Sequence, residues 1–250
     1  MDLQLKGKTA VVTGASKGIG AGIARRLASE GARVIVNYNR GKADAEKVVR
    51  EIEAAGGQAA AIQGNVAEAA DVKRLFETAV STYGPVEVLV NNAGVYQFGP
   101  VEAFKEEDYD YHFNTNVKGV FLAIQESLKH FPATGGSIIN ISSVLSKGPI
   151  AYASVYVATK AAVDALSESL AVELGPRKIR VNVVAPGPVE TEGTHATGMI
   201  GSDVLIKTVA ETPLGRLGQP EDIAETVVYL ASANSGWVTG ERIGATGGLK

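Results

Sequence analysis

The chain contains 250 residues, of which 45% are hydrophobic and 20% charged, so it is long enough for one large domain with a full core. Its net charge of −3, without a concentrated basic stripe, does not fit a nucleic-acid-binding protein. Cysteine is absent, three histidines are scattered, and no apolar run reaches membrane-spanning length, so we expect no metal site, no membrane partner and a cytoplasmic location.

Short runs rich in valine and isoleucine alternate with helical patterns along the whole chain. Strands are predicted at residues 8–14, 32–38, 58–66, 86–94, 135–143, 179–187 and 242–245. Helices are predicted at residues 18–31, 43–57, 68–83, 107–131, 154–175 and 220–231. This alternation predicts an α/β fold, a doubly wound parallel sheet of Rossmann type with about seven strands and helices on both faces.

No linker or tandem repeat divides residues 1–250, which predicts a single domain. One irregular stretch, at about residues 188–219, is unusually long for a loop in a compact domain. We therefore interpret it as a substrate lid rather than as a boundary between domains.

A glycine-rich loop, "TGASKGIG", joins the first predicted strand to the first predicted helix. Gly14, Gly18 and Gly20 would let the backbone turn tightly and approach a ligand, and the helix start would offer free N–H groups to a pyrophosphate. The spacing differs from the usual G-x-G-x-x-G, and a purely structural turn is the alternative. Its place between strand and helix favours the binding of a dinucleotide.

The second predicted strand ends in "NYNR", residues 37–40. A site specific for NAD usually has a carboxylate here for the ribose 2′-hydroxyl, whereas this chain has Tyr38, Asn39 and Arg40. Lys17 lies in the nearby glycine loop. Because these cations could attract a 2′-phosphate, we predict NADP(H) over NAD(H); solvated surface charges are the alternative.

Together these motifs resemble the short-chain dehydrogenase/reductase family over essentially the whole chain. "TGASKGIG" matches the cofactor motif of the family, and "NNAG" (91–94) matches the segment that follows its fourth strand. "NTNVKG" (114–119), "YVATK" (156–160) and "PGPVET" (186–191) match the N-x-x-G, Y-x-x-x-K and P-G-x-x-x-T elements. Each motif is degenerate alone, but their common order and separation are highly specific.

The chemistry of carbonyl reduction explains why the family needs such residues. Hydride transfer leaves negative charge on the carbonyl oxygen, so an acid must stand within hydrogen-bond reach. Tyr156 and Lys160 are four residues apart on one predicted helix and share a face, and a nearby ammonium should lower the tyrosine pKa from about 10. Ser143 ends a strand, where its hydroxyl could donate to the oxyanion, and the resemblance selects it over Ser142.

The resemblance also implies further roles. Asn116 would hold a water that links Lys160 to solvent, with a helix kink or cap as the alternative, and Lys160 would also hold the nicotinamide ribose. Asn65 stands where relatives commonly have an aspartate beside the adenine. The cofactor-binding residues implied by the resemblance or by the loop and strand chemistry above are Gly14, Ser16, Lys17, Gly18, Ile19, Gly20, Tyr38, Asn39, Arg40, Asn65, Val66, Asn92, Ala93, Gly94, Tyr156, Lys160, Pro186, Gly187, Val189 and Thr191.

The expected function is an NADP(H)-dependent oxidoreductase that interconverts a small-molecule ketone and a secondary alcohol. Within the family the pattern is similar to 3-oxoacyl carrier-protein reductases, glucose dehydrogenases and polyhydroxynaphthalene reductases, with a lean toward the last group. Apolar residues at 95–97 and 144–150 favour a ring or chain over a bare sugar. A nucleotide sensor without turnover is the alternative outside the enzymes, and the resemblance implies a homotetramer or homodimer.

Overall fold

The computed structural model describes residues 3–196 and 202–249. Within these residues seven strands form one parallel sheet in the order β3-β2-β1-β4-β5-β6-β7. The strands are β1 (Thr9–Val12), β2 (Arg33–Tyr38), β3 (Gln58–Gln63), β4 (Val86–Asn91), β5 (Gly136–Ile141), β6 (Ile179–Pro186) and β7 (Arg242–Ala245). All seven predicted strands are confirmed, each at or inside its predicted range.

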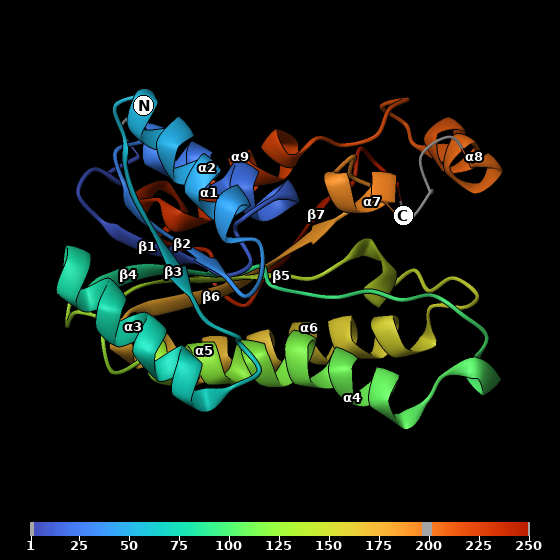
Figure 1. The fold of residues 1–250 in the computed structure, drawn as a ribbon, viewed down its shortest axis with the longest axis horizontal. Coiled ribbons are helices and arrows are strands. Elements are labelled where there is room, and N and C mark those ends of the chain that lie inside the picture. Colours follow the sequence, from blue (N-terminus) through green and yellow to red (C-terminus); the bar gives the residue numbers. More distant parts are fainter. Residues whose placement is uncertain (1–2, 197–201, 250) are drawn as a thin grey trace.

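Helices cover both faces of the sheet, as the alternating pattern predicted (Figure 1). The α-helices are α1 (Gly18–Ser29), α2 (Lys42–Ala54), α3 (Ala69–Tyr83), α4 (Glu106–Phe113), α5 (Gly119–Ser127), α6 (Ser154–Leu174), α7 (Glu192–Ala196), α8 (Asp203–Glu211) and α9 (Pro220–Ala231). Local sequence explains the start of α9, which has Pro220 at its first position and a capping box between Gln219 and Asp222.

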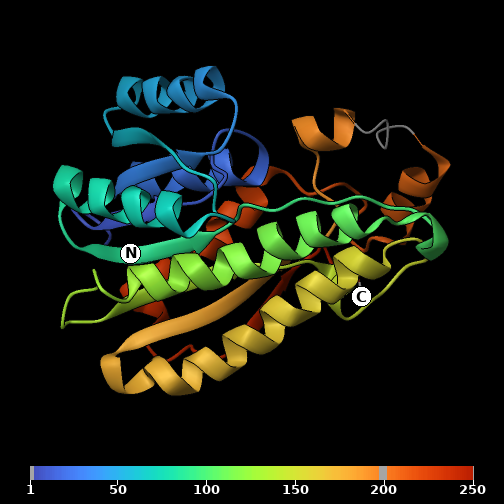
Figure 2. The ribbon, with the colours of Figure 1, turned by 60° about the horizontal axis from the view of Figure 1, so that its bottom comes forward.

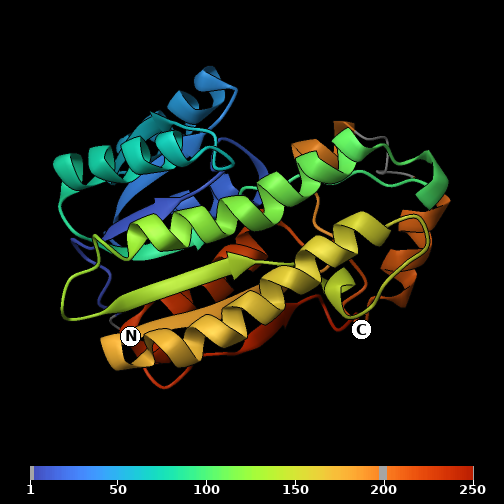
Figure 3. The ribbon, with the colours of Figure 1, turned by 90° about the horizontal axis from the view of Figure 1, so that it is seen from below.

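Alternate residues of the central strands supply two separate cores. Val12 and its equivalents pack against α1, α2 and α9, whereas Val11 and its equivalents pack against α3, α5 and α6. Figure 2 and Figure 3 show α5 and α6 lying side by side across one face of the sheet, the face opposite to α1, α2 and α9. Both faces of the central strands are therefore buried, which explains their continuous Val/Ile composition.

The predicted helix 107–131 is wrong as a single element. It divides into α4 and α5, which are joined by a π-helical segment at Asn114–Lys118. Such segments are rare and occur mostly as local bulges, often at functional sites. Hydrophobic periodicity continues through the bulge, so the sequence pattern did not reveal it.

The predicted irregular stretch 188–219 is also more ordered than expected. It contains α7 and α8, and its two ends are joined by a bridge between Val189 and Gly218. Part of the predicted lid, residues 197–201, lies outside the described residues.

The strand order reverses between β1 and β4, and parallel sheets of this kind bind ligands beyond the carboxyl ends of their strands at that point.

None of the helices in the described ranges is both long and apolar enough to span a membrane.

Candidate active site

The glycine loop packs tightly against the segment that follows β4. Gly14 has a φ of +61°, and a Cβ built on it would lie 2.8 Å from Ala93 Cα, so no other residue fits there without a shift. A Cβ on Gly20 would lie 2.4 Å from Asn92 Nδ2, which donates to Gly14 O at 3.0 Å. The structure therefore brings the predicted residues of the loop and of "NNAG" together.

Two buried polar residues that the sequence analysis did not select fix this loop. Thr13 Oγ1 accepts hydrogen bonds from the main-chain N–H groups of Asn92 and Ala93, both at 3.0 Å. Asn37 Oδ1 accepts from Gly14 N at 3.2 Å, while its Nδ2 donates to Gly64 O at 3.1 Å. The presence of an asparagine inside the otherwise apolar run of β2 is the sequence signal that could have revealed the role of Asn37.

The end of β2 carries the groups that were predicted to select the cofactor. Tyr38 is buried, whereas Asn39, Arg40 and Lys17 are exposed. Neither Arg40 nor Lys17 has an ion-pair partner among the residues that the structure describes. In the adjacent loop, Asn65 Oδ1 accepts from Ala67 N at 3.1 Å, which orders the turn that also contains Val66.

The first turn of the lid reaches the glycine loop. The Glu192 carboxylate accepts a hydrogen bond from Gly18 N at 3.0 Å, and a Cβ on Gly18 would lie 3.4 Å from the Thr191 side chain. The N–H that the sequence analysis left free for a pyrophosphate is therefore paired with a carboxylate of α7. Glu192 was not among the predicted site residues, because nothing in its local pattern places it beside a residue 174 positions away.

Lys160 and Tyr156 lie on α6 beneath the carboxyl ends of β4 and β5. Lys160 is buried, and its Nζ donates to Ile141 O at 2.9 Å and lies 5.7 Å from the centre of the Tyr156 ring. Burial lowers the pKa of Lys160 to about 8, while the Asp164 carboxylate acts in the opposite direction.

The pKa of Tyr156 departs from the expectation. Burial raises it above its ordinary value, although a hydrogen bond with the Ser143 hydroxyl acts to lower it. The net direction is therefore opposite to the expected lowering, because desolvation of the phenol dominates.

Asn116 lies in the π-helical segment and is fully buried. Its Oδ1 accepts from Val95 N at 2.8 Å, and its Nδ2 donates to Val95 O at 2.9 Å and to Thr159 Oγ1 at 3.1 Å. A Cβ on Gly94 would lie 3.4 Å from Asn116 Oδ1 and 3.5 Å from Lys160 Nζ, so these two groups flank the same point. Asn116 thus ties the segment after β4 to α6 beside Lys160.

Ser142 and Ser143 follow β5 and have different contacts. Ser142 Oγ donates to Lys160 O at 3.3 Å, whereas Ser143 Oγ accepts from Leu145 N at 3.2 Å, and the Ser143 hydroxyl acts to lower the pKa of the Tyr156 phenol. Pro186 ends β6, and Gly187 N, just after it, donates to Ala245 O at 3.0 Å; Val189 and Thr191 follow in the chain.

Aromatic rings line the mouth of this site. The ring centres of Tyr96 and Phe98 lie 6.3 Å and 5.9 Å from that of Tyr156, both in edge-to-face geometry. Both rings remain partly exposed, and Tyr96 Oη faces Gly193 of α7. Geometrically, the site combines a phenol, a hydroxyl and an ammonium beneath an apolar wall.

Comparison with known proteins agrees with this architecture. A family model described as enoyl-(acyl carrier protein) reductase matches residues 14–250. An uncharacterized oxidoreductase of Methylorubrum extorquens is 55% identical over 247 residues, covering 99% of both chains. The 3-oxoacyl-[acyl-carrier-protein] reductase of Staphylococcus aureus is 44% identical over 97% of this chain and 98% of its own. The hydroxynaphthalene reductase-like protein Arp2 of Metarhizium majus is 40% identical over 98% and 95%.

Solved structures give the same result. A blue fluorescent protein from a metagenomic library, in complex with NADPH, superposes with a TM-score of 0.91 at 40% identity, covering 98% of both chains. A short-chain dehydrogenase from Burkholderia cenocepacia, in complex with NADP, superposes with a TM-score of 0.92 at 33% identity, covering 98% of this chain and 99% of its own. The chain belongs to the short-chain dehydrogenase/reductase family and is an oxidoreductase.

Proposed function

We propose that this oxidoreductase uses NADP(H) to interconvert a ketone and a secondary alcohol, with Tyr156 as the acid and base. The observation that carries the proposal is the grouping of the Tyr156 phenol with the Ser143 hydroxyl and the Lys160 ammonium at the carboxyl edge of the sheet. These are the groups that a carbonyl oxygen requires while it gains negative charge.

In the reduction direction, bound NADPH supplies the hydride that adds to the carbonyl carbon. Tyr156 gives its phenolic proton to the carbonyl oxygen, and Ser143 donates a hydrogen bond to that oxygen as charge develops. Lys160 stabilises the phenolate that remains. Asn116 Oδ1 retains a second lone pair, which supports its role in holding a water near Lys160 for return of the proton.

The residues of this chain fit the proposed cofactor. The strand end at residues 37–40 has no carboxylate to repel a 2′-phosphate, and Lys17 and Arg40 are exposed cations beside it. Lys160 would hold the nicotinamide ribose, and Val189 with Thr191 would hold the carboxamide. Two structural relatives contain NADPH or NADP, which supports the same preference.

This preference has a direct test. The wild-type enzyme is expected to have a KM for NADPH at least about tenfold below its KM for NADH. Arg40→Ala should raise the KM for NADPH by about tenfold and leave the KM for NADH unchanged, because it removes a charge-assisted hydrogen bond to the 2′-phosphate. Arg50→Ala is the matched control, because it removes an exposed arginine on α2, ten positions farther along the chain. A wild-type preference for NADH would contradict the assignment.

A second prediction concerns the carboxylate at the glycine loop. Glu192→Gln is expected to lower the Kd for NADPH by about fivefold, because the negative charge both competes for Gly18 N–H and repels a pyrophosphate. Fluorescence titration measures this. Glu190→Gln is the control, since Glu190 bonds His195 and Gln219 instead of the loop; equal effects of the two substitutions, or none from Glu192→Gln, would contradict a local role.

The aromatic wall supports a cyclic or aromatic ketone as substrate, because Tyr96 and Phe98 place partly exposed aromatic rings beside Tyr156. The Staphylococcus relative supports a second candidate, a 3-oxoacyl thioester. A panel of cyclic ketones, quinones, β-ketoesters, 3-oxoacyl thioesters and, in reverse, sugars distinguishes these substrates. Turnover on none of them, with NADPH still bound, would favour the sensor alternative.

A homotetramer or homodimer remains part of the proposal. Val172 on α6 and Trp237 near the C-terminus are strongly exposed apolar residues, which suits subunit contacts, and sedimentation measures the mass.

A further inference from the structure

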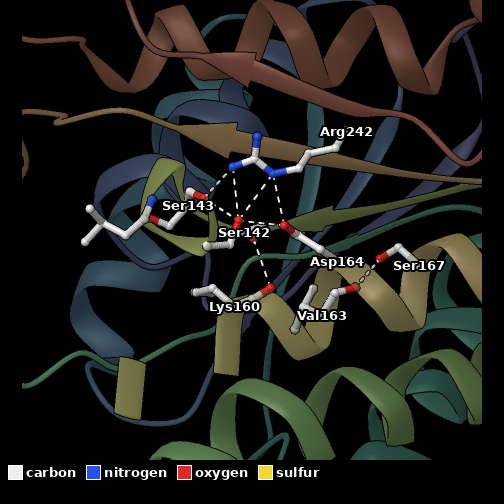
Figure 4. A network of polar contacts seen from close by, with 9 residues as sticks. Ser142, Ser143, Lys160, Val163, Asp164, Ser167 and Arg242 are labelled. Atoms are coloured by element: carbon white, nitrogen blue, oxygen red, sulfur yellow. Dashed lines mark hydrogen bonds and ion pairs between the residues drawn. The ribbon is translucent and has the colours of Figure 1, made fainter. Parts of the chain in front are cut away.

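An ion pair between Arg242 and Asp164 lies directly behind the active site (Figure 4). Arg242 Nε stands 2.9 Å from Asp164 Oδ2, and the two side chains are only 16% and 8% exposed. It is the least exposed ion pair in the described part of the chain. Neither residue belongs to the matched sequence motifs, and 78 positions separate them.

A buried pair of this kind is not explained by stability alone. Removal of two charges from water is unfavourable, and apolar residues of similar volume often stabilise a protein equally well. Asp164 Oδ1 is moreover buried without a hydrogen-bond partner among the described residues. The network is therefore expected to serve something other than stability, and its contacts indicate what that is.

Arg242 connects three elements that build the active site. It stands at the start of β7, Asp164 stands one helical turn after Lys160 on α6, and Ser143 follows β5. Arg242 Nη2 donates to Ser143 O at 2.8 Å and to Ser146 Oγ at 3.0 Å. Ser146 Oγ in turn donates to Asp164 Oδ2 at 2.6 Å, so the 3₁₀ turn after Ser143 is tied to α6 through both charges.

We propose that Arg242, anchored by Asp164, is a positioning residue that fixes the main chain of Ser143 and thereby aims the Ser143 hydroxyl at the substrate oxygen. The proposal rests on the donor role of Ser143 in the proposed function. A guanidinium suits this task, because its planar fork can bond a carboxylate with one nitrogen and a carbonyl with another. Small displacements of such a donor lower the reaction rate, because the stabilisation of an oxyanion depends on the geometry of its hydrogen bonds.

The experiment combines Arg242 variants with removal of the hydroxyl that they are proposed to aim. Arg242→Lys keeps the charge beside Asp164 but cannot reach both partners at once, and Arg242→Met removes all the donors. We expect kcat for carbonyl reduction to fall by about fivefold and about twentyfold, respectively, with the Kd for NADPH unchanged. In a Ser143→Ala background the same substitutions should change kcat by less than about twofold, because residues that act as a unit are non-additive.

Arg180→Met is the matched control. Arg180 is also half-buried and donates to main-chain carbonyls, those of Leu230 and Ser232, but it lies at the opposite edge of the sheet, near the start of β6. We expect it to lower Tm without changing kcat.

Failure of the proposed function and failure of the positioning role of Arg242 would give different results. If Ser143→Ala itself leaves kcat intact, the donor role in the proposed function is wrong, and with it this proposal. If Ser143→Ala lowers kcat but the Arg242 substitutions do not, or reduce it by the same factor in both backgrounds, Arg242 does not act through Ser143. Arg242→Lys retains the ion pair, so the proposal stays testable even if Arg242→Met fails to fold.

Discussion

Replacement of Tyr156 by phenylalanine is expected to lower kcat for carbonyl reduction by about a thousandfold, with the Kd for NADPH within about twofold of wild type. The substitution removes one hydroxyl and keeps the ring that contacts Tyr96 and Phe98 edge to face. Without the phenol, the site loses the acid proposed to protonate the carbonyl oxygen; the Ser143 hydroxyl donates only a hydrogen bond there, and Lys160 Nζ donates to Ile141 O. Steady-state kinetics and a cofactor titration measure the two quantities.

A neighbouring phenol supplies the control for this prediction. Tyr96 lies 6.3 Å from Tyr156 between ring centres, and burial likewise raises its pKa, but its hydroxyl faces α7. Tyr96→Phe should therefore cost less than about tenfold in kcat. If Tyr156→Phe kept a tenth or more of the wild-type rate, the proton would have to come from another group, and the central assignment would be wrong.

The sequence predicted the parts of this fold that depend on local pattern. Most strands are rich in Val and Ile, and α9 has the bounds that were predicted for it, with Pro220 and a capping box at its start. The pairing of Tyr156 with Lys160 followed from four-residue spacing on one helix, and α6 places both residues as expected.

The parts that were missed depend on contacts between distant segments. The break between α4 and α5 coincides with Asn116, whose amide bonds Val95, and with Gly119, where a Cβ would lie 2.8 Å from Val66 Cγ2. Neither contact has a signature in helical periodicity. The raised pKa of Tyr156 was missed for a similar reason, since desolvation depends on everything packed around the phenol.

The charge of Lys160 is expected to control how the rate of carbonyl reduction depends on pH. Its ammonium has a pKa of about 8, lowered by burial, whereas the pKa of Tyr156 is raised above its ordinary value of about 10. As pH rises from 7 to 10, the lysine therefore loses its charge while the phenol keeps its proton. Below pH about 7 both groups are protonated, so kcat/KM for reduction should be constant there.

Above pH about 8 the rate should fall, because a neutral amine no longer stabilises the phenolate left by proton transfer. If only the charged form is active, kcat/KM should decline about tenfold for each pH unit and reach about a hundredth of its plateau near pH 10. Lys160→Met should lower activity at pH 7 by about a hundredfold and also abolish the decline between pH 7 and 9.

The change in the shape of the profile separates a catalytic charge from a structural one. A lysine that only packed against Ile141 and α6 would lower the rate on substitution but leave the pH dependence of the remaining activity unchanged. Lys129→Met, which removes an exposed ammonium from the far end of the same layer of helices, should leave both the rate and the profile as in wild type. A wild-type profile that stays flat to pH 10 while far-UV circular dichroism shows a folded protein would exclude Lys160 as the titrating group, because its charge would then be lost without effect on proton transfer.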